Sequence, residues 1–192
     1  MLILASASPR RHELLRNAGI EFVVEPANVP EEVLPGETPA ACAQRLARAK
    51  ARAIFNQRSA DPSQIAVLGA DTIVVVGDGI LGKPVDADDA ARMLRLLSGR
   101  EHQVITGVCL ITPGSPPKED VRHEITQVTM DALTDTEIAD YVASGEPTDK
   151  AGAYAIQGRA SRWIPKIDGC YFNVVGLPIS LVHRMLREAG GR

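Results

Sequence analysis

Hydrophobic and polar positions along the chain follow two periods, which predict strands and helices in alternation. The apolar run at residues 2–5 predicts a buried strand, and apolar positions then recur at helical spacing until Gly19 ends the helix. Ser8 is the expected N-cap of this helix and Pro9 its first residue, where the missing N–H of proline is tolerated. Residues 20–24 predict a second strand.

A long alanine-rich helix is predicted in the next part of the chain. The acidic, proline-containing residues 26–40 indicate a surface loop, and Thr38 is expected to open a helix that runs to residue 57. Helical spacing predicts a buried stripe made of Leu46, Ala49, Ala53 and Ile54. The polar face of the same helix is expected to carry Arg45, Arg48, Lys50 and Arg52.

The rest of the chain alternates strands, helices and hairpins. Residues 65–76 predict a buried strand that is interrupted at Asp71 and Thr72, followed by a Gly-Asp-Gly turn and a short return strand. Further predicted elements are a capped helix within residues 86–99, strands at residues 102–112 and 124–133, a helix at residues 134–145 that begins with a capping box, and a strand, turn and closing helix within residues 173–190. This order favours an α/β or α+β domain around a mixed sheet.

The composition supports one globular domain and limits what the chain binds. Its 192 residues, 45% hydrophobic and 23% charged, are enough to bury a core as one domain with two lobes. The net charge of −3 argues against a surface that coats nucleic acid, so an anion bound in a local basic pocket is expected to be small. Three cysteines without a CxxC pair, no basic leader and no span-length apolar stretch predict reduced thiols, no membrane segment and a cytoplasmic location.

Arg10 and Arg11 raise the question of why two cations lie at the start of a helix. The helix dipole and the free backbone N–H groups already concentrate positive charge there. The two guanidinium groups therefore repel each other until an anion arrives, which makes this helix start a candidate anion site. Two solvated arginines on flexible stems are the other interpretation.

Asp71 is the candidate for acid–base chemistry or metal binding. Its sequence neighbours are apolar and are expected to be buried, so an unpaired carboxylate there would be strongly unfavourable and must have a partner. A structural interpretation has it capping backbone N–H groups or pairing with an arginine. A functional interpretation places it at a strand end facing a cleft, as a general base or metal ligand. Thr72 either offers its hydroxyl to a substrate or is an ordinary strand residue.

Other charged residues are candidates for phosphate and metal binding. Lys83, between a glycine and a proline, suits a phosphate or is a solvated turn lysine. The histidines and cysteines show no zinc spacing, so a metal is expected to be a hard, oxygen-liganded ion such as Mg²⁺. Glu31 and Glu32 would join Asp71 in holding it, unless they are plain surface charge.

Residues 148–158, "TDKAGAYAIQG", combine small residues with a lysine, a tyrosine and a glutamine between two glycines. Gln157 carries both a donor and an acceptor, so it is suited to reading the edge of a base, and Tyr154 is suited to packing against a ring. A tight structural loop uses similar glycines, so the composition of this segment leaves both interpretations open.

Seven stretches, in chain order, resemble the Maf family of nucleoside triphosphate pyrophosphatases: "ASASPRR", "RLARAKA", "GADTIVV", "GKP", "SGREHQVITGV", "DKAGAYAIQG" and "NVVGLP". The resemblance covers nearly the whole chain and implies a single Maf-like domain over residues 1–192. It implies an elongated mixed β-sheet flanked by helices, similar to the inosine triphosphatase fold, with two lobes around a cleft. The implied reaction hydrolyses a nucleoside triphosphate to the monophosphate and pyrophosphate with a divalent cation, Mg²⁺ or alternatively Mn²⁺.

The resemblance also implies roles for particular residues. Asp71 takes the position of the proton acceptor and, with Glu31, that of a metal ligand. The positions around the triphosphate fall to Arg10, Arg11, Lys50 and Lys83. The positions that mark the branch acting on dTTP and UTP, rather than on 7-methyl-GTP, are Arg10, Thr72 and Gln157. One departure, Pro30 where an aspartate is frequent, leaves the number of metal-binding carboxylates open.

Two other functions are compatible with the resemblance. One is the same hydrolase with another base specificity, for 7-methyl-GTP or modified nucleotides. The other is a nucleotide-binding regulator of cell division, because the family is also associated with inhibition of septum formation. Asp71 and Lys83 favour an enzyme, since a binder has no need for a base. The expected partners are dTTP and UTP, without nucleic acid or membrane, in a homodimer whose role is to limit incorporation of non-standard or excess nucleotides.

Overall fold

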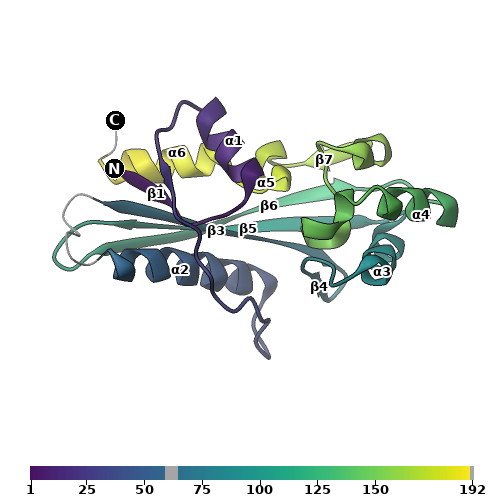
Figure 1. The fold of residues 1–192 in the computed structure, drawn as a ribbon, viewed down its shortest axis with the longest axis horizontal. Helices are drawn as coiled ribbons and strands as arrows, with labels where there is room; N and C mark the ends of the chain where they lie inside the picture. The colour runs from purple at the N-terminus through teal and green to yellow at the C-terminus, as the bar shows by residue number, and fades with distance from the viewer. Residues whose placement is uncertain (59–64, 191–192) are drawn as a thin grey trace. The chain divides into compact units, whose positions relative to one another are not determined.

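The computed structural model describes residues 1–58 and 65–190, which form a mixed β-sheet with helices packed on it (Figure 1). Within these residues the sheet has seven strands in the order β2-β1-β3-β5-β6-β7, with β4 beside β3. The strands are β1 (Leu2–Leu4), β2 (Val23–Val24), β3 (Ala66–Val76), β4 (Gly79–Leu81), β5 (Glu101–Thr112), β6 (Lys118–Thr129) and β7 (Lys166–Asp168). Strand β1 is parallel to β2 and β3, whereas β4 is antiparallel to β3 and β7 to β6. The predicted mixed α/β class is confirmed.

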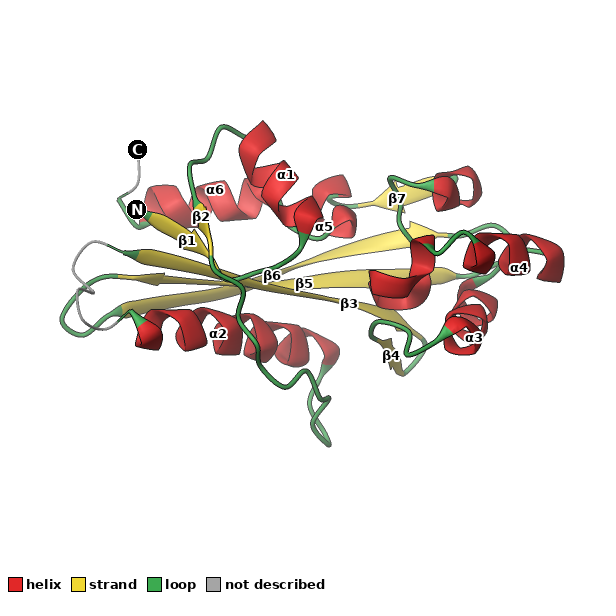
Figure 2. Ribbon diagram, in the orientation of Figure 1, coloured by secondary structure: helices red, strands yellow, loops and turns green. Residues whose placement is uncertain are grey.

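Figure 2 shows the helices beside the strands, and three of the described helices begin at a residue whose side chain caps the first turn. The helices are α1 (Pro9–Asn17), α2 (Pro39–Gln57), α3 (Ala87–Leu97), α4 (Asp135–Ala143), α5 (Tyr171–Val175) and α6 (Ile179–Glu188), with 3₁₀ turns η2 (Glu146–Asp149), η3 (Ala151–Ala153) and η4 (Arg159–Trp163). The Thr38 side chain accepts from the Ala41 N–H, and Thr134 forms the predicted capping box with Glu137. Ser8 is the N-cap of α1, but its side chain makes no capping hydrogen bond.

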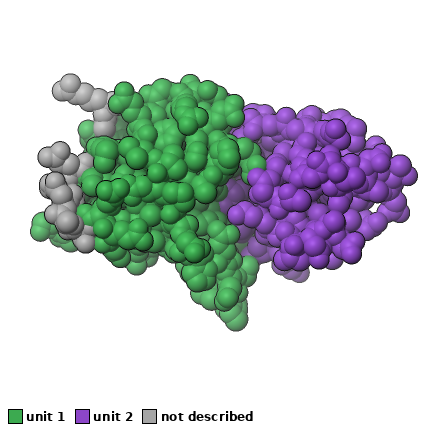
Figure 3. All heavy atoms as spheres, viewed as in Figure 1, with its two compact units in different colours: residues 1–71, 106–124, 176–192 green, residues 72–105, 125–175 purple. Residues whose placement is uncertain are grey.

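The chain divides into two compact units (Figure 3). Unit 1 is formed by Met1–Asp71, Thr106–Glu124 and Gly176–Arg192, and unit 2 by Thr72–Ile105 and Ile125–Val175. Strands β3, β5 and β6 contribute residues to both units. Among the described residues, none of the helices has both the length and the apolar character needed to cross a membrane.

In unit 1, α2 lies on one face of the strands and α1 and α6 lie on the other (Figure 2). Buried apolar residues of α2 pack with those of the strands around Ile3, Val67 and Cys109. The approach of α2 is close because glycines face it: a Cβ added at Gly69 would come within 2.8 Å of the Ala51 nitrogen. These contacts hold the middle of α2 against the strand that carries Asp71.

In unit 2, a second core contains the unit's buried aromatic residues. Helix α3 contacts α4 and η3, and its Met93 and Leu94 are buried. Tyr141 of α4 lies edge-to-face with Trp163, with ring centroids 5.4 Å apart. This packing surrounds the 3₁₀ turns and positions the segment that continues from η3.

Some sequence-based predictions of elements were wrong. Strand β3 runs without interruption through Asp71, and β2 occupies only the end of residues 20–24. The predicted strand at the start of residues 173–190 is instead the end of α5. Strand β6 begins at Lys118, inside the predicted loop, and ends at Thr129, before the predicted end at residue 133.

Candidate active site

Asp71 is buried in the middle of β3, not at a strand end as predicted, with 6% of its surface exposed. Its required partner is Lys50 of α2, whose Nζ donates to Oδ1 at 2.6 Å. Lys50 is itself buried, so its prediction as part of a polar helix face was wrong. The buried carboxylate and the buried ammonium neutralise each other, whereas either charge alone would be strongly unfavourable at this depth.

The helical period explains why Lys50 faces the strands. The buried positions of α2 are Cys42, Ala43, Leu46, Ala47, Lys50, Ala51 and Ile54. These positions recur at three- and four-residue spacing, so they form one stripe that includes Lys50 and excludes the predicted Ala49 and Ala53, which are only half-buried. Arg48 and Arg52 are exposed, as predicted, and both donate to Glu119.

Lys50 also contacts Glu31, the other predicted metal ligand. Its Nζ lies 2.5 Å from the Glu31 Oε1, so two carboxylates meet at one ammonium. Glu31 comes from the loop before α2 and is considerably more exposed than Asp71. The structure therefore brings together three of the predicted site residues, Lys50, Asp71 and Glu31.

A clamp that the sequence analysis missed holds the loop of Glu31. Arg45 of α2 donates to both oxygens of Glu37, at 2.6 and 2.9 Å, and to the Glu32 carbonyl at 2.8 Å. Glu37 also accepts from the Leu34 N–H at 2.8 Å. The Arg45 guanidinium lowers the pKa of Glu37 to about 2, so the clamp carries charge at any ordinary pH. The sequence contains a signal for this ion pair. An acidic residue, Glu37, stands directly before the N-cap of α2, and an arginine, Arg45, follows two turns inside the helix.

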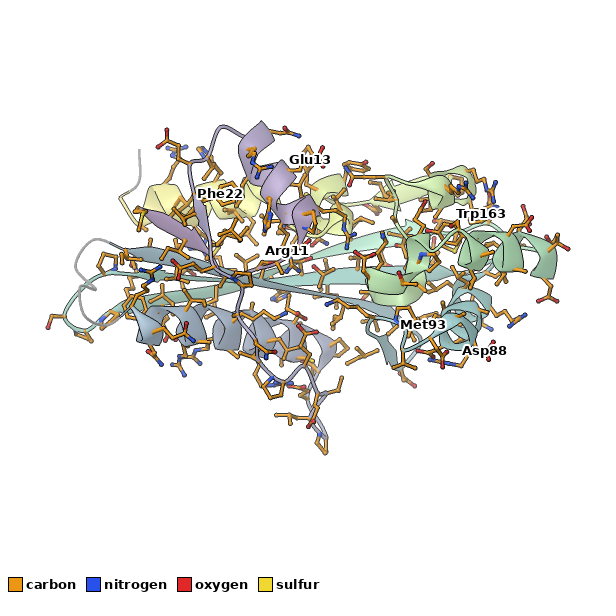
Figure 4. The ribbon with its side chains drawn as sticks, viewed as in Figure 1. Arg11, Glu13, Phe22, Asp88, Met93 and Trp163 are labelled. Carbon is orange, nitrogen blue, oxygen red and sulfur yellow. The ribbon has the colours of Figure 1, made fainter. Side chains whose placement is uncertain are left out.

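Arg11 is buried in unit 1, which excludes the interpretation of a solvated arginine at this position (Figure 4). Its Nε donates to the Gly176 carbonyl at 2.8 Å, and its Nη1 donates to the Ser6 Oγ at 3.1 Å and to the Ala70 carbonyl at 2.9 Å. Burial is the main cause of the lowered pKa of Arg11, and the positive charge of Arg10 lowers this pKa further. The negative charges of Asp71 and Glu31 act in the opposite direction. Arg11 thus fixes the backbone next to Asp71 and places positive charge beside it.

The predicted substrate-binding residues not yet placed are Arg10 of α1, which is half-buried in unit 1, and three residues of unit 2. Thr72 follows Asp71 in β3 and is half-buried. Lys83 is exposed in the turn after β4, between Gly82 and Pro84. Gln157 is exposed between the turns η3 and η4.

The residues in unit 1 fit a hard cation only in part. Across residues 1–58 and 65–190, no cluster of three or more His, Cys, Asp or Glu side chains is arranged to hold a metal on its own. Two carboxylates do converge, from Asp71 and Glu31. Mg²⁺ is commonly held by one or two carboxylates together with substrate phosphates, so this donor set fits a cation that arrives with an anionic substrate.

The fold and the site define a mixed α/β protein with a buried lysine–aspartate pair and a buried arginine beside it. Residues 1–189 match the family described as Maf-like protein, and the chain belongs to the Maf family. It is 58% identical over 189 residues, 98% of this chain and 94% of the relative, to the dTTP/UTP pyrophosphatase of Koribacter versatilis. It is 50% identical over 190 residues, 99% of both chains, to the dTTP/UTP pyrophosphatase of Xanthomonas campestris pv. campestris.

A comparison with solved structures finds the nucleoside-triphosphatase / dITP/XTP pyrophosphatase from Mycobacterium abscessus. The two chains are 20% identical, with a TM-score of 0.43, and the match covers 69% of this chain and 74% of the other.

Proposed function

We propose that this chain is a nucleoside triphosphate pyrophosphatase that hydrolyses dTTP and UTP to the monophosphate and pyrophosphate. The observation that carries the proposal is the identity of 58% over 189 residues with a relative named dTTP/UTP pyrophosphatase. The buried Asp71–Lys50 pair is intact in this chain.

Asp71 is the proposed general base of this reaction. A water oxygen forms a bond to the α-phosphorus, the bond from that phosphorus to the oxygen bridging it to the β-phosphate breaks, and pyrophosphate leaves with the bonding electrons. Asp71 accepts the proton that the water gives up. Lys50 holds Oδ1 at 2.6 Å, so the orientation of the carboxylate is set before a substrate arrives.

Positive side chains are proposed to stabilise the charge that develops on the phosphates. Arg10 and Arg11 lie in the first turn of α1, where the helix dipole adds to their charge. Arg11 acts at least through its position, since its hydrogen bonds to Ala70 and Ser6 hold it beside Asp71. Lys83 is the proposed phosphate ligand from unit 2, as a compact charge on an exposed turn.

A divalent cation, Mg²⁺ or Mn²⁺, is proposed as the cofactor. Asp71 and Glu31 would hold it, together with phosphate oxygens of the substrate. When bound, the cation supplies charge stabilisation to the phosphoryl oxygens. The Lys50 ammonium contacts the same two carboxylates and holds them near each other.

Selection of thymine or uracil is proposed to rest on Arg10, Thr72 and Gln157. A homodimer in the cytoplasm is part of the same proposal: the dimer rests on the family, and the location on the unpaired cysteines and the lack of a span-length apolar stretch. Limiting the incorporation of non-standard or excess nucleotides is the role that this activity would serve.

The proposal is tested by product analysis with dTTP, UTP, CTP, GTP and 7-methyl-GTP, with Mg²⁺ and with a chelator. We expect monophosphate and pyrophosphate from dTTP and UTP, no turnover with the chelator, and a rate at least 100-fold lower for Asp71→Asn, because the amide cannot take a proton from water. Orthophosphate as the product, or an Asp71→Asn variant of unchanged rate, would contradict the proposal. Binding of nucleotides without turnover of any would favour the regulatory function.

A further inference from the structure

Gln157 lies in a segment whose backbone has little regular structure of its own. The segment of residues 150–159 includes the short 3₁₀ turn η3 and reaches the start of η4, and two of its residues have a left-handed conformation, Gly152 with φ of 69° and Ala153 with φ of 59°. A Cβ at Gly152 would come within 3.0 Å of Val74, and the Gly152 N–H donates to the Gly82 carbonyl at 3.0 Å. Such a segment keeps one conformation only if side chains from elsewhere hold it.

Tyr154 anchors the segment on one side of Gln157. Its hydroxyl forms a 2.7 Å hydrogen bond with the Nε2 of His102, and the two rings meet edge-to-face with centroids 5.3 Å apart. Burial lowers the pKa of His102 to about 4 and raises the pKa of Tyr154. Both groups are therefore neutral at pH 7, and the bond joins two uncharged, buried partners.

Tyr141 of α4 holds the next residue. Its Oη accepts from the Ala155 N–H at 3.1 Å and donates to the Glu146 Oε1 at 2.8 Å. The Tyr141 side chain is fully buried, and burial raises the pKa of its hydroxyl, so the proton needed for the second bond stays in place. The backbone N–H of Ala155 is thereby hydrogen-bonded to a side chain of α4.

Glu146 holds the segment on the other side of Gln157. Its carboxylate accepts from the Arg159 N–H, with Oε1 at 3.0 Å and Oε2 at 3.2 Å. It also lies against Gly158, where an added Cβ would overlap the carboxylate. The Tyr141–Glu146 pair therefore fixes the backbone on both sides of an exposed Gln157.

We propose that Tyr141 and Glu146 are positioning residues that hold Gln157 in the place from which it selects thymine or uracil. The inference rests on the proposed function, in which Gln157 reads the base. An amide carries a donor and an acceptor side by side, and when turned over it matches cytosine as well as it matches uracil. Discrimination therefore also requires that the amide lie at a fixed place along the edge of the base, and Tyr141 and Glu146 hold the backbone that sets this place.

The test compares kcat and KM for UTP and CTP in the full-length protein and its variants. The Gln157→Ala variant shows how far the ratio of kcat/KM for UTP to that for CTP falls when this side chain no longer contacts the base. In Tyr141→Phe, which keeps the ring and removes only the hydroxyl, the ratio of kcat/KM for UTP to that for CTP is expected to fall about tenfold, mainly through a higher KM for UTP. Glu146→Ala is expected to lower the ratio similarly, and Glu146→Gln to restore most of it because the amide oxygen accepts the same hydrogen bonds.

Glu137→Gln is the matched control in the same unit. Glu137 accepts from the Trp163 indole at 3.1 Å and caps α4, but its hydrogen bonds do not reach residues 154–159. This variant is expected to keep the wild-type ratio even where its stability falls. Hydrogen exchange of the Ala155 and Arg159 amides gives a second readout, and both amides are expected to exchange faster in Tyr141→Phe.

The outcomes separate this inference from the proposed function. An active Tyr141→Phe with an unchanged UTP-to-CTP ratio, or with unchanged exchange at both amides, overturns the inference and leaves the function standing. A wild-type protein that hydrolyses neither UTP nor dTTP overturns both. An equal fall in the ratio for Glu137→Gln would mean that the effect is one of general stability, and would also overturn the inference.

Discussion

At the scale of single residues, the candidate site is organised around one ammonium group. Lys50 lies 2.6 Å from Asp71 and 2.5 Å from Glu31, and its side chain is almost entirely withdrawn from water. Two carboxylates at one place would repel each other, and a buried carboxylate without a partner loses its hydration with nothing in return. Lys50 is therefore the residue on which the arrangement of both acids depends.

Substitution Lys50→Met is expected to lower the free energy of unfolding by about 3–5 kcal/mol, because the buried Asp71 carboxylate loses the ammonium that pairs with it directly. Urea denaturation at pH 7 measures the change. Arg48→Met on the same helix is the control, since Arg48 is exposed and its pair with Glu119 contributes at most about 1 kcal/mol. Adding Asp71→Asn to Lys50→Met should recover part of the loss. If Lys50→Met and Arg48→Met lower the free energy of unfolding equally, the buried pair stabilises the protein no more than an exposed pair does.

At the scale of elements, the helix that supplies Lys50 lies unusually close to the strand that supplies Asp71. Gly69 and Gly107 face the backbone of α2, and the residues opposite them are alanines, including Ala43 and Ala51. A larger residue at either glycine would displace the helix. The 2.6 Å bond between Lys50 and Asp71 joins the helix and the strand at this close approach.

Gly69→Ala is expected to destabilise the protein by about 1–3 kcal/mol, because the new methyl group would come within 2.9 Å of the Ala51 Cβ and closer still to backbone atoms of α2. Thermal or urea unfolding measures the loss. Gly82→Ala is the matched control, since nothing lies within 4 Å of a Cβ at that position. Similar stabilities of the two variants would show that α2 adjusts without strain.

At the scale of the whole molecule, most charges face water and influence folding little. The chain carries 21 basic and 24 acidic residues, and pairs such as Arg95–Asp135 are largely exposed. The response of stability to pH therefore depends on the buried groups, of which His102 has the most displaced pKa within the ordinary pH range. Burial lowers that pKa from 6.5 to about 4.

Between pH 6.5 and about pH 4, the unfolded chain binds a proton at residue 102 that the folded chain does not bind, so acid favours unfolding. The contribution of His102 is fully present above pH 6.5 and is lost as the pH falls towards 4, with a slope of at most about 1.4 kcal/mol per pH unit. Urea denaturation from pH 7.5 to pH 4 measures it. His102→Gln is expected to show a flatter profile, whereas His123→Gln, at an exposed position, should keep the wild-type slope. Parallel profiles for all three proteins would contradict the assignment.

Sequence reasoning was most accurate where the determining interactions are local. Thr38 and the Thr134–Glu137 capping box marked the starts of α2 and α4, because capping joins residues three positions apart. It was least accurate where a residue distant in sequence determines the local structure. The sequence predicts an interruption of the strand at Asp71. The strand continues instead, because Asp71 is neutralised by a lysine from another element, which the residues of the strand do not reveal. Similarly, the strand predicted after residue 172 is a short helix.

The sequence by itself determined the alternation of elements, the family, and the requirement that Asp71 have a partner, because periodicity, capping and the energetics of a buried carboxylate follow from residue types. Only the tertiary structure decided that this partner is Lys50, that Arg11 is buried against three oxygen atoms, and that Tyr141 and Glu146 secure the segment of Gln157. These contacts join residues far apart along the chain. Their distances depend on how closely helices and strands pack, and packing is a property of the assembled core.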